Sequence, residues 1–241
     1  MRHFISAIQF ITILPAGKPG PFDPPKMMPF FPLVGLLLGV LVAGFDRLAA
    51  IFWNEPVVAL LDVIFLAMVT GAFHLDGLGD TADGLLGQRT RDKALIIMKD
   101  SRIGAMGLVA VVFGLALKWG GIAGLEVNRS LLLIIIPAYA RSGVLFGIRF
   151  LEYGRPDGGT GLEFFKEPLK PAAFWGLILP VGASLLLGGQ ALWLNLCFIL
   201  IVSTILFYYK KRIGCITGDM CGAMIELLEA GLFLLVSVSG I

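Results

Sequence analysis

Long apolar runs separated by short polar stretches are the dominant pattern of this chain. A transmembrane helix needs about 20 predominantly apolar residues. Runs that approach or exceed this length lie at about residues 30–52, 57–73, 104–123, 130–148, 172–188, 190–208 and 222–240. The pattern predicts an all-α, polytopic integral membrane protein: a helical bundle of about seven transmembrane helices that forms a single membrane-embedded domain over residues 1–241.

The N-terminal segment, residues 1–29, differs from the rest of the chain. Its apolar run from Phe4 to Leu14 is too short to cross a bilayer. The prolines between Pro15 and Pro29 disfavour a regular helix, because proline lacks the backbone N–H and clashes with the preceding turn. We therefore expect an interfacial or re-entrant segment that leads into the first span.

The composition supports a membrane environment. The chain is 57% hydrophobic and 15% charged, with a mean hydropathy of +0.89, whereas soluble domains are roughly 25% charged. The net charge of +2 gives no ground for a nucleic-acid partner. The three cysteines have no CxxC spacing and an odd number, so they predict no disulfide framework. The lipid bilayer is the expected surrounding.

The distribution of basic residues predicts the orientation. With a cytoplasmic N-terminus, 15 of the 19 lysines and arginines fall in the N-terminal segment and in loops near 74–103, 149–171 and 209–221. Arg47, Lys118 and Arg129 fall on the other side, and Arg141 lies within a span. Cytoplasmic loops carry an excess of Lys and Arg. The long polar loops are therefore predicted to face the cytoplasm, with Lys210, Lys211 and Arg212 as a topology anchor.

The stretch FHLDGLGDTADGLLG, residues 73–87, follows the second apolar run and carries three aspartates. If it is helical, Asp76, Asp80 and Asp83 share one stripe, and leucines occupy the opposite side. Three like charges in one stripe repel one another unless a cation lies among them, and Mg²⁺ prefers carboxylate oxygens. The alternative is a solvated acidic turn at a helix N-terminus, where aspartate is favoured by the helix dipole.

Further candidates stand close to the predicted membrane boundary. Asp100, Ser101 and Arg102 precede the third span, together with basic residues that are suited to phosphate or lipid headgroups. In the loop YGRPDGGTG, a glycine-rich backbone with an arginine is compatible with a phosphate cradle. Gly158, Gly159 and Gly161 equally describe a mobile loop.

Ionisable residues inside the predicted spans also need an explanation. Arg141 lies in an apolar run, where such a group normally faces a partner or a polar cavity; near a helix end it would instead snorkel to the surface. Asp219 and Glu226 share a helical face. Acids in the last span are costly unless paired, so Glu226 and Glu229 either complete a metal site or pair with Arg141.

Several blocks taken together resemble the cobalamin synthase family of adenosylcobinamide-GDP ribazoletransferases. They are HLDGLGDTADGLLG, KDSRIGAMG, the step Ala140-Arg141-Ser142, YGRPDGGTG, TGDMCGAMIELLE, and the N-terminal FISAIQFITILP and FFPLVGLLLG. The resemblance implies a Mg²⁺-dependent enzyme of the bacterial cytoplasmic (inner) membrane whose active site faces the cytoplasm. Such an enzyme transfers the cobinamide phosphate of adenosylcobinamide-GDP to α-ribazole or its 5′-phosphate and releases GMP. It leaves open a homo-oligomer or a complex with other cobalamin-pathway enzymes.

On this hypothesis, each candidate residue has an expected role. Asp76, Asp80 and Asp83 hold Mg²⁺, and one of them or His74 accepts the hydroxyl proton; a carboxylate is favoured because an ideal helix points His74 away from the stripe. The groups expected to bind substrate phosphates are Arg102, Arg141, Ser101 and Gly159. The groups expected to complete or support the metal site are Asp100, Asp219 and Glu226.

Two other functions fit parts of the pattern. The acidic stripe is reminiscent of the CDP-alcohol phosphatidyltransferases of phospholipid synthesis, but this chain has DxxxDxxDG, and Asp100 lies farther away than that family's motif requires. A cation-coupled transporter would use the buried acids and Arg141 as a pathway. The acids instead gather at predicted cytoplasmic ends, and the chain shows no two-half repeat of the kind that many transporters have.

Overall fold

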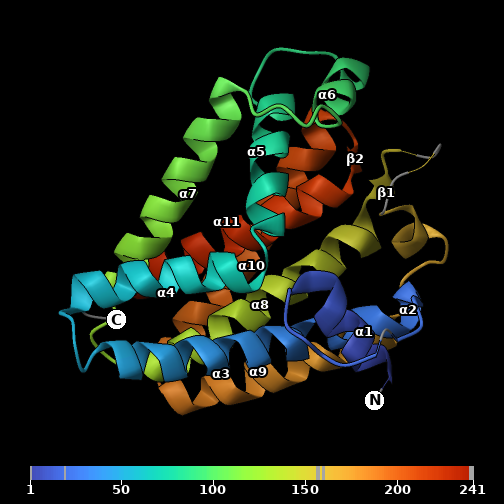
Figure 1. Ribbon diagram of the computed structural model, residues 1–241. Helices are drawn as coiled ribbons and strands as arrows, with labels where there is room; N and C mark the ends of the chain where they lie inside the picture. The colour runs from blue at the N-terminus through green and yellow to red at the C-terminus, as the bar shows by residue number, and fades with distance from the viewer. Residues whose placement is uncertain (1, 19, 156–157, 159–160, 239–241) are drawn as a thin grey trace.

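The computed structural model describes residues 2–18, 20–155, 158 and 161–238, and most of this part is helical (Figure 1). The α-helices are α1 (Arg2–Ile11), α2 (Pro24–Met27), α3 (Phe31–Ala49), α4 (Glu55–Val69), α5 (Phe73–Leu85), α6 (Arg91–Ile97), α7 (Ala105–Ala123), α8 (Arg129–Phe150), α9 (Ile178–Ser184), α10 (Gln190–Arg212) and α11 (Gly218–Val236). Short 3-10 helices are η1 (Met28–Phe30), η2 (Leu162–Phe165), η3 (Pro171–Leu177) and η4 (Leu185–Leu187). Two short strands, β1 (Glu152–Tyr153) and β2 (Cys215–Ile216), pair in parallel.

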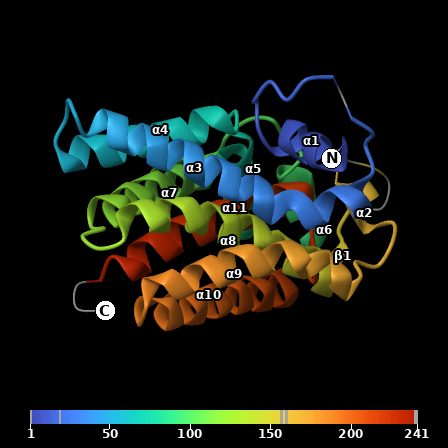
Figure 2. The same ribbon diagram turned by 90° about the horizontal axis from the view of Figure 1, so that it is seen from below.

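Helix α8 lies at the centre of the bundle. It packs against α3, α9, α10 and α11, and α11 packs in turn against α5 and α7 (Figure 2). Of the apolar window in α8, 83% is buried inside the protein, compared with 22% for α7. The remaining apolar surface of the outer helices includes exposed Leu, Val, Ile and Phe side chains. Because lipid solvates such surface, this distribution confirms an all-α membrane protein.

Small residues set the closest helix contact. A Cβ atom on Gly35 of α3 would lie 2.5 Å from the Cα of Ala138 in α8, and one on Gly39 would collide with the backbone of Ile134. Glycines four residues apart expose the helix backbone to its neighbour, which is the common basis of tight packing between membrane helices. The segment FFPLVGLLLG therefore holds the central pair of helices together.

Four described helical segments are long and apolar enough to cross a membrane: Pro24–Ala49, Ala105–Ala123, Arg129–Phe150 and Gln190–Arg212. The predicted span 57–73 instead ends at Val69. There the chain bends by 90° into α5, and the two helices together form either one further, broken span or a re-entrant loop. The bend is possible because Gly71 and Ala72 both adopt positive φ.

The other two predicted spans do not combine the length and the apolar composition of these helices. The run 172–188 corresponds to Pro171–Leu187, a shorter apolar helical segment that contains two 3-10 stretches. The last run begins earlier than predicted, at Gly218, and carries three acidic residues in one helix. The structure thus supports four or five apolar spans.

The proline-rich segment contains more helix than predicted. Helix α1 is followed by irregular chain, but regular helix begins at Pro24, still within the segment 1–29. Pro24 and Pro25 occupy the first turn of α2, and Pro32 that of α3. Proline is tolerated there because the first backbone N–H groups of a helix have no partner within the helix.

A buried ion-pair cluster ties together the end of the bundle opposite the two strands. Arg129, at the start of α8, donates from Nε to Asp46 of α3 at 2.7 Å and from Nη2 to Asp62 of α4 at 3.2 Å. It also donates to the carbonyl oxygen of Ile122. Arg129 was expected in an external connection. It is instead largely buried, and it compensates the charge of two aspartates inside the helices.

Candidate active site

The acidic stripe lies on α5, as its periodicity predicts. Leu75, Leu78, Ala82 and Leu85 are buried, while Asp76 is exposed and Asp80 and Asp83 are half-buried. The predicted loop 74–103 therefore begins with a packed helix of 13 residues. The apolar side chains of α5 are buried in the bundle, where the helix contacts α7 and α11.

Helix α11 brings a fourth carboxylate to the stripe. A Cβ atom on Gly77 of α5 would lie 2.6 Å from the backbone oxygen of Asp219, so only glycine permits this approach. The charges of Asp76, Asp219 and Asp83 all act on the carboxylate of Asp80. The predicted convergence of Asp219 with the stripe is thus present in the structure.

The two-stranded ladder places an arginine beside these acids. Glu152 pairs with Cys215 and Tyr153 with Ile216, which aligns the chain after α8 with the chain before α11. As a result, Arg155 lies 2.7 Å from Asp219, measured from Nη2 to Oδ2. Its Nε is buried and has no hydrogen-bond partner in the described part of the chain. Sequence analysis offered the arginine of this glycine-rich loop as part of a phosphate cradle but did not name Arg155 among the phosphate-binding residues.

Asp83 has a structural partner of its own. Its Oδ2 accepts a hydrogen bond from the backbone N–H of Gly104 at 2.6 Å, and its Oδ1 accepts one from Gly107 at 2.9 Å. These N–H groups belong to the first turn of α7, where a helix has unpaired donors and a favourable dipole. Asp83 therefore joins α5 to α7, and this contact is why small residues follow Arg102.

The segment of Asp100, Ser101 and Arg102 precedes that helix start; Asp100 is half-buried, and Ser101 and Arg102 are exposed. Arg102 forms an ion pair with Asp100 at 2.6 Å, and the hydrogen bonds from Arg102 lower the pKa of Asp100 to about 2. Asp100 is thus a carboxylate whose charge is already compensated locally. Gly159 lies outside the described residues.

Arg141 and Glu226 meet in a second, buried cluster within the bundle. Lys118 Nζ lies 2.6 Å from Glu226 and 2.6 Å from Glu229, and Arg141 pairs with Glu229. All four side chains are at most 4% exposed. Of the two alternatives for Glu229, the structure shows the pair with Arg141. Lys118, counted on the non-cytoplasmic side at the end of the span 104–123, lies inside the bundle, where it neutralises the two glutamates of α11.

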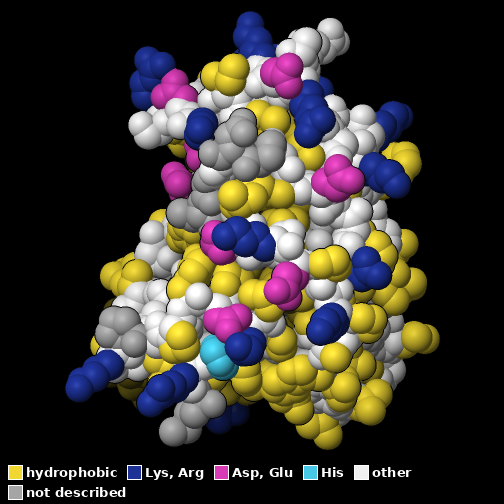
Figure 3. Space-filling model, turned by 90° about the vertical axis from the view of Figure 1, so that its right-hand side faces the viewer, with side chains coloured by type: hydrophobic (Ala, Val, Ile, Leu, Met, Phe, Trp, Pro, Cys, Tyr) yellow, Lys and Arg dark blue, Asp and Glu magenta, His cyan; other side chains and the backbone are white. Residues whose placement is uncertain are grey.

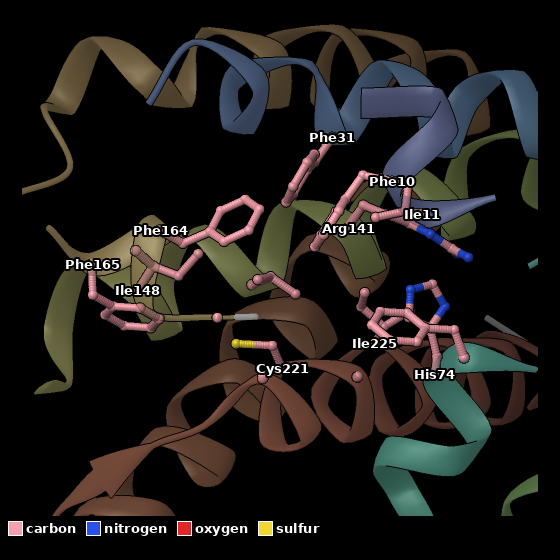
Figure 4. A pocket seen from close by; sticks show the side chains of 15 residues that line it. Phe10, Ile11, Phe31, His74, Arg141, Ile148, Phe164, Phe165, Cys221 and Ile225 are labelled. Atoms are coloured by element: carbon pink, nitrogen blue, oxygen red, sulfur yellow. The ribbon is translucent and has the colours of Figure 1, made fainter. Parts of the chain in front are cut away.

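His74 is placed apart from the aspartates. Its side chain is 1% exposed, and both ring nitrogens lack a hydrogen-bond partner in the described part of the chain. It faces Arg141 across a cavity between α5, α8 and α11 (Figure 4). The expectation that His74 points away from the acidic stripe therefore agrees with the structure.

Arg212 holds the end of α5. Its guanidinium donates to the carbonyl oxygens of Leu85 and Arg89, each at 3.0 Å, and also to that of Gly87. A cation at a helix C-terminus compensates the unpaired carbonyl groups and the negative end of the dipole. Arg212 was expected to act as a topology anchor; the structure shows that it also fixes the helix that carries the acidic stripe.

The loops around this site share one end of the molecule. The loop after α5, the strand β1 and the strand β2 lie toward the side occupied by α1 and α2. Seen from that side, lysine, arginine, aspartate and glutamate side chains are spread across the surface (Figure 3). The predicted polar loops therefore lie together, as the distribution of basic residues required.

The donor chemistry of the stripe fits a divalent cation. Four carboxylates, those of Asp76, Asp80, Asp83 and Asp219, lie near two arginines: Arg155 pairs with Asp219, and Arg89 donates to the backbone carbonyl oxygen of Asp83. Negative charge is therefore in excess, and all donors are carboxylate oxygens. Over the described ranges, no three His, Cys, Asp or Glu side chains are arranged to hold one metal ion. Charge and donor type are therefore in place, without a preformed coordination shell among these residues.

The fold and the site together define a class: a polytopic helical membrane protein with an acidic, phosphate-compatible site at one end. A family model described as cobalamin-5-phosphate synthase matches residues 3–237. The adenosylcobinamide-GDP ribazoletransferase of Geotalea daltonii is 36% identical, covering 100% of this chain and 99% of the relative. That of Klebsiella pneumoniae is 34% identical, with 98% of each chain covered. The chain belongs to the cobalamin-5-phosphate synthase family. No solved structure matches it.

Proposed function

We propose that this protein is an adenosylcobinamide-GDP ribazoletransferase that acts in the assembly of the cobalamin nucleotide loop. The main support for this proposal is that the chain matches the family over residues 3–237 and that four aspartates and Arg155 lie together at one end of the bundle. Relatives that carry this activity in their names align over nearly their whole length. This match favours the ribazoletransferase over a CDP-alcohol phosphatidyltransferase or a transporter.

The reaction needs positioned charges more than a reactive side chain. A ribose hydroxyl of α-ribazole or its 5′-phosphate attacks the phosphorus that bears cobinamide. The new P–O bond forms as the P–O bond to GMP breaks, and the hydroxyl proton passes to a carboxylate. Asp80, half-buried between the charges of Asp76 and Asp219, is our candidate for that acceptor.

Mg²⁺ is the cation that this donor set would bind, and when bound it would neutralise charge on the departing phosphate. Asp76, Asp80 and Asp219 are the candidate ligands, with Asp83 next to them and oriented by the first turn of α7. Asp100 is paired with Arg102 and Glu226 with Lys118, and neither is among the charges that act on Asp80, so we leave them out of the ligand set.

Arg155 is the candidate phosphate ligand. It is largely buried, it approaches Asp219 at 2.7 Å, and its Nε has no partner in the described part of the chain. A guanidinium recognises phosphate oxygens through paired N–H donors. Arg102 is exposed, and Ser101 stands beside it, so both are suited to a second contact at the rim. Arg141 is engaged by Glu229 within the bundle.

We further propose the predicted topology: seven crossings, a cytoplasmic N-terminus, and residence in the bacterial cytoplasmic membrane with the site facing the cytoplasm. The excess of basic residues in the loops at the site's end supports this orientation. Labelling of introduced cysteines in inverted and right-side-out vesicles tests this orientation. The cysteine of Glu126→Cys, in the exposed connection between α7 and α8, is expected to react from the side opposite to that of Arg89→Cys.

The activity is tested with purified protein in lipid nanodiscs. Adenosylcobinamide-GDP and α-ribazole 5′-phosphate should yield GMP and adenosylcobalamin 5′-phosphate, whereas CDP-lipid with an alcohol should yield no CMP. EDTA should stop the reaction and added Mg²⁺ should restore it. Absence of GMP from a folded, monodisperse preparation would overturn the proposal.

A further inference from the structure

A cavity lined by phenylalanines lies beside the acidic site. Its walls come from α1, α3, α5, α8, α11 and η2. It encloses about 60 Å³ and opens into a wider mouth, with which the space amounts to about 570 Å³. The ring of Phe10 lies 4.9 Å from that of Phe164, 6.3 Å from that of Phe31 and 6.3 Å from that of Phe73. These rings, shown in part in Figure 4, come from four separate segments of the chain and form one aromatic wall.

Two nitrogen-bearing side chains face this apolar space. His74 is 1% exposed, and neither of its nitrogens has a hydrogen-bond partner in the described part of the chain. Arg141 is also 1% exposed, and its Nε lacks a partner, although Nη1 is paired with Glu229. Buried polar groups in native proteins are almost always hydrogen-bonded. Unpartnered nitrogens at a cavity therefore indicate that a ligand or water supplies the missing partner.

The cavity and the acidic site share their walls. Gly218 and Cys221, which line the cavity, stand on either side of Asp219 in the chain. Phe73 and His74 line it from the first turn of α5, directly before Asp76. Cavity-lining residues and acidic residues therefore lie within one turn of each other on both α5 and α11, although His74 itself points away from the stripe.

The chemistry of the walls selects among flat groups. An anion requires a free cation, but Arg141 is already compensated by Glu229. Guanine presents several N–H donors and needs matching acceptors, whereas among the lining side chains only the second nitrogen of His74 and the weak acceptor Cys221 could serve. An N-glycosylated benzimidazole has no N–H and one ring-nitrogen acceptor, which an N–H of His74 can satisfy.

We propose that this cavity is the binding site for the benzimidazole base of the ribazole acceptor, with His74 as hydrogen-bond donor and the phenylalanines as stacking partners. The assignment rests on the proposed transferase function and extends it to a specificity-determining site. Aromatic rings stack in offset or edge-to-face arrangements, and the four wall rings offer both faces and edges.

The kinetic test separates the two substrates. In nanodiscs, Phe164→Leu and His74→Leu are each expected to raise the KM for α-ribazole 5′-phosphate about tenfold, with the KM for adenosylcobinamide-GDP unchanged. Phe198→Leu is the matched control, because Phe198 and Phe164 are each 5% exposed and Phe198 lies outside the cavity. A rise in the KM for adenosylcobinamide-GDP alone, or no change in either KM, would overturn the assignment.

A binding test measures occupancy of the cavity independently of the transfer reaction. Isothermal titration of the wild-type protein with bare 5,6-dimethylbenzimidazole should give a saturable signal that weakens about tenfold in Phe164→Leu and stays unchanged in Phe198→Leu. Binding of the base without GMP release would retain the cavity assignment and reject the transferase. GMP release with no binding of the base would retain the transferase and reject the cavity assignment. The cavity assignment would also be rejected if the base displaced a lipid with equal strength in all variants.

Discussion

Two charged clusters on the same helix have opposite character. Toward the C-terminal half of α11, Glu226 and Glu229 meet Lys118 and Arg141, so two negative and two positive charges compensate one another. At the N-terminus of α11, Asp219 joins the acidic stripe, where negative charge is in excess and the side chains are only partly buried.

This difference distinguishes a structural cluster from a binding site. A buried charge is tolerated when it is paired, and removal of one partner leaves an uncompensated ion in a medium that solvates it poorly. Aspartates that repel one another near the surface instead gain stability from an added cation. The first cluster is therefore compensated within the protein, and on our proposal a bound cation completes the second.

The largest effect is expected from breaking the compensated cluster. Glu229→Gln leaves Arg141 without its carboxylate and Lys118 with one fewer, so unfolding should become easier by about 3–5 kcal/mol. Thermal denaturation in detergent measures this. The double variant Lys118→Met with Glu226→Gln removes one charge of each sign, and we expect it to be closer to wild type; equal loss in both would contradict charge compensation.

The acidic stripe should respond in the opposite way. Asp80→Asn is expected to lower GMP release by about 10²–10³-fold, the size of effect seen when a positioned electrostatic group is removed. The melting temperature should stay the same or rise, because one repelling charge is lost. Mg²⁺ should raise the melting temperature of the wild type and not that of the variant. Glu126→Gln, exposed at the other end, is the carboxylate-to-amide control.

A smaller effect is expected at the clamp on α5. Arg212→Gln removes the charged group that contacts three backbone carbonyls at the end of the helix, at a cost of about 1–3 kcal/mol. GMP release should fall together with stability, because the stripe loses its support. Lys210→Gln, an exposed neighbour in the same basic run, should change neither quantity.

Asp83 should behave differently from Asp80. Asp83→Asn replaces one acceptor oxygen with an amide that cannot accept from the first turn of α7, so stability should fall by about 1–2 kcal/mol. Comparison of the melting curves of the two variants tests the distinction. A loss of stability for Asp80→Asn equal to that for Asp83→Asn would mean that both residues are structural.

The smallest effect is expected at Asp100. Arg102 holds its pKa at about 2, below the ordinary value of 3.8, so its contribution to stability is present above pH 4 and is lost only as the pH falls toward 2. Melting curves of the wild type and of Asp100→Asn should therefore run in parallel from pH 5 to pH 8. A divergence within this interval would show that Asp100 has another charged partner.

Periodicity predicted much of the site. The i, i+4, i+7 spacing of Asp76, Asp80 and Asp83 placed them on one side of α5, and the shared face of Asp219 and Glu226 holds within α11. The partners of these residues were not predictable in the same way. Lys118 fell within the predicted span 104–123 without a predicted partner, because hydropathy averages over a window and cannot show which side chain neutralises a charge inside it.

The sequence by itself determined the membrane class, the helical content, the end of the molecule at which the polar loops gather, and the family. These follow from local composition, spacing and extended similarity. Only the tertiary structure decided that α4 and α5 bend by 90°, that Arg155 meets Asp219, and that Glu226 is paired while the stripe is not. The reason is physical: the net charge of a cluster depends on side chains that lie close in space but more than 60 residues apart in the chain.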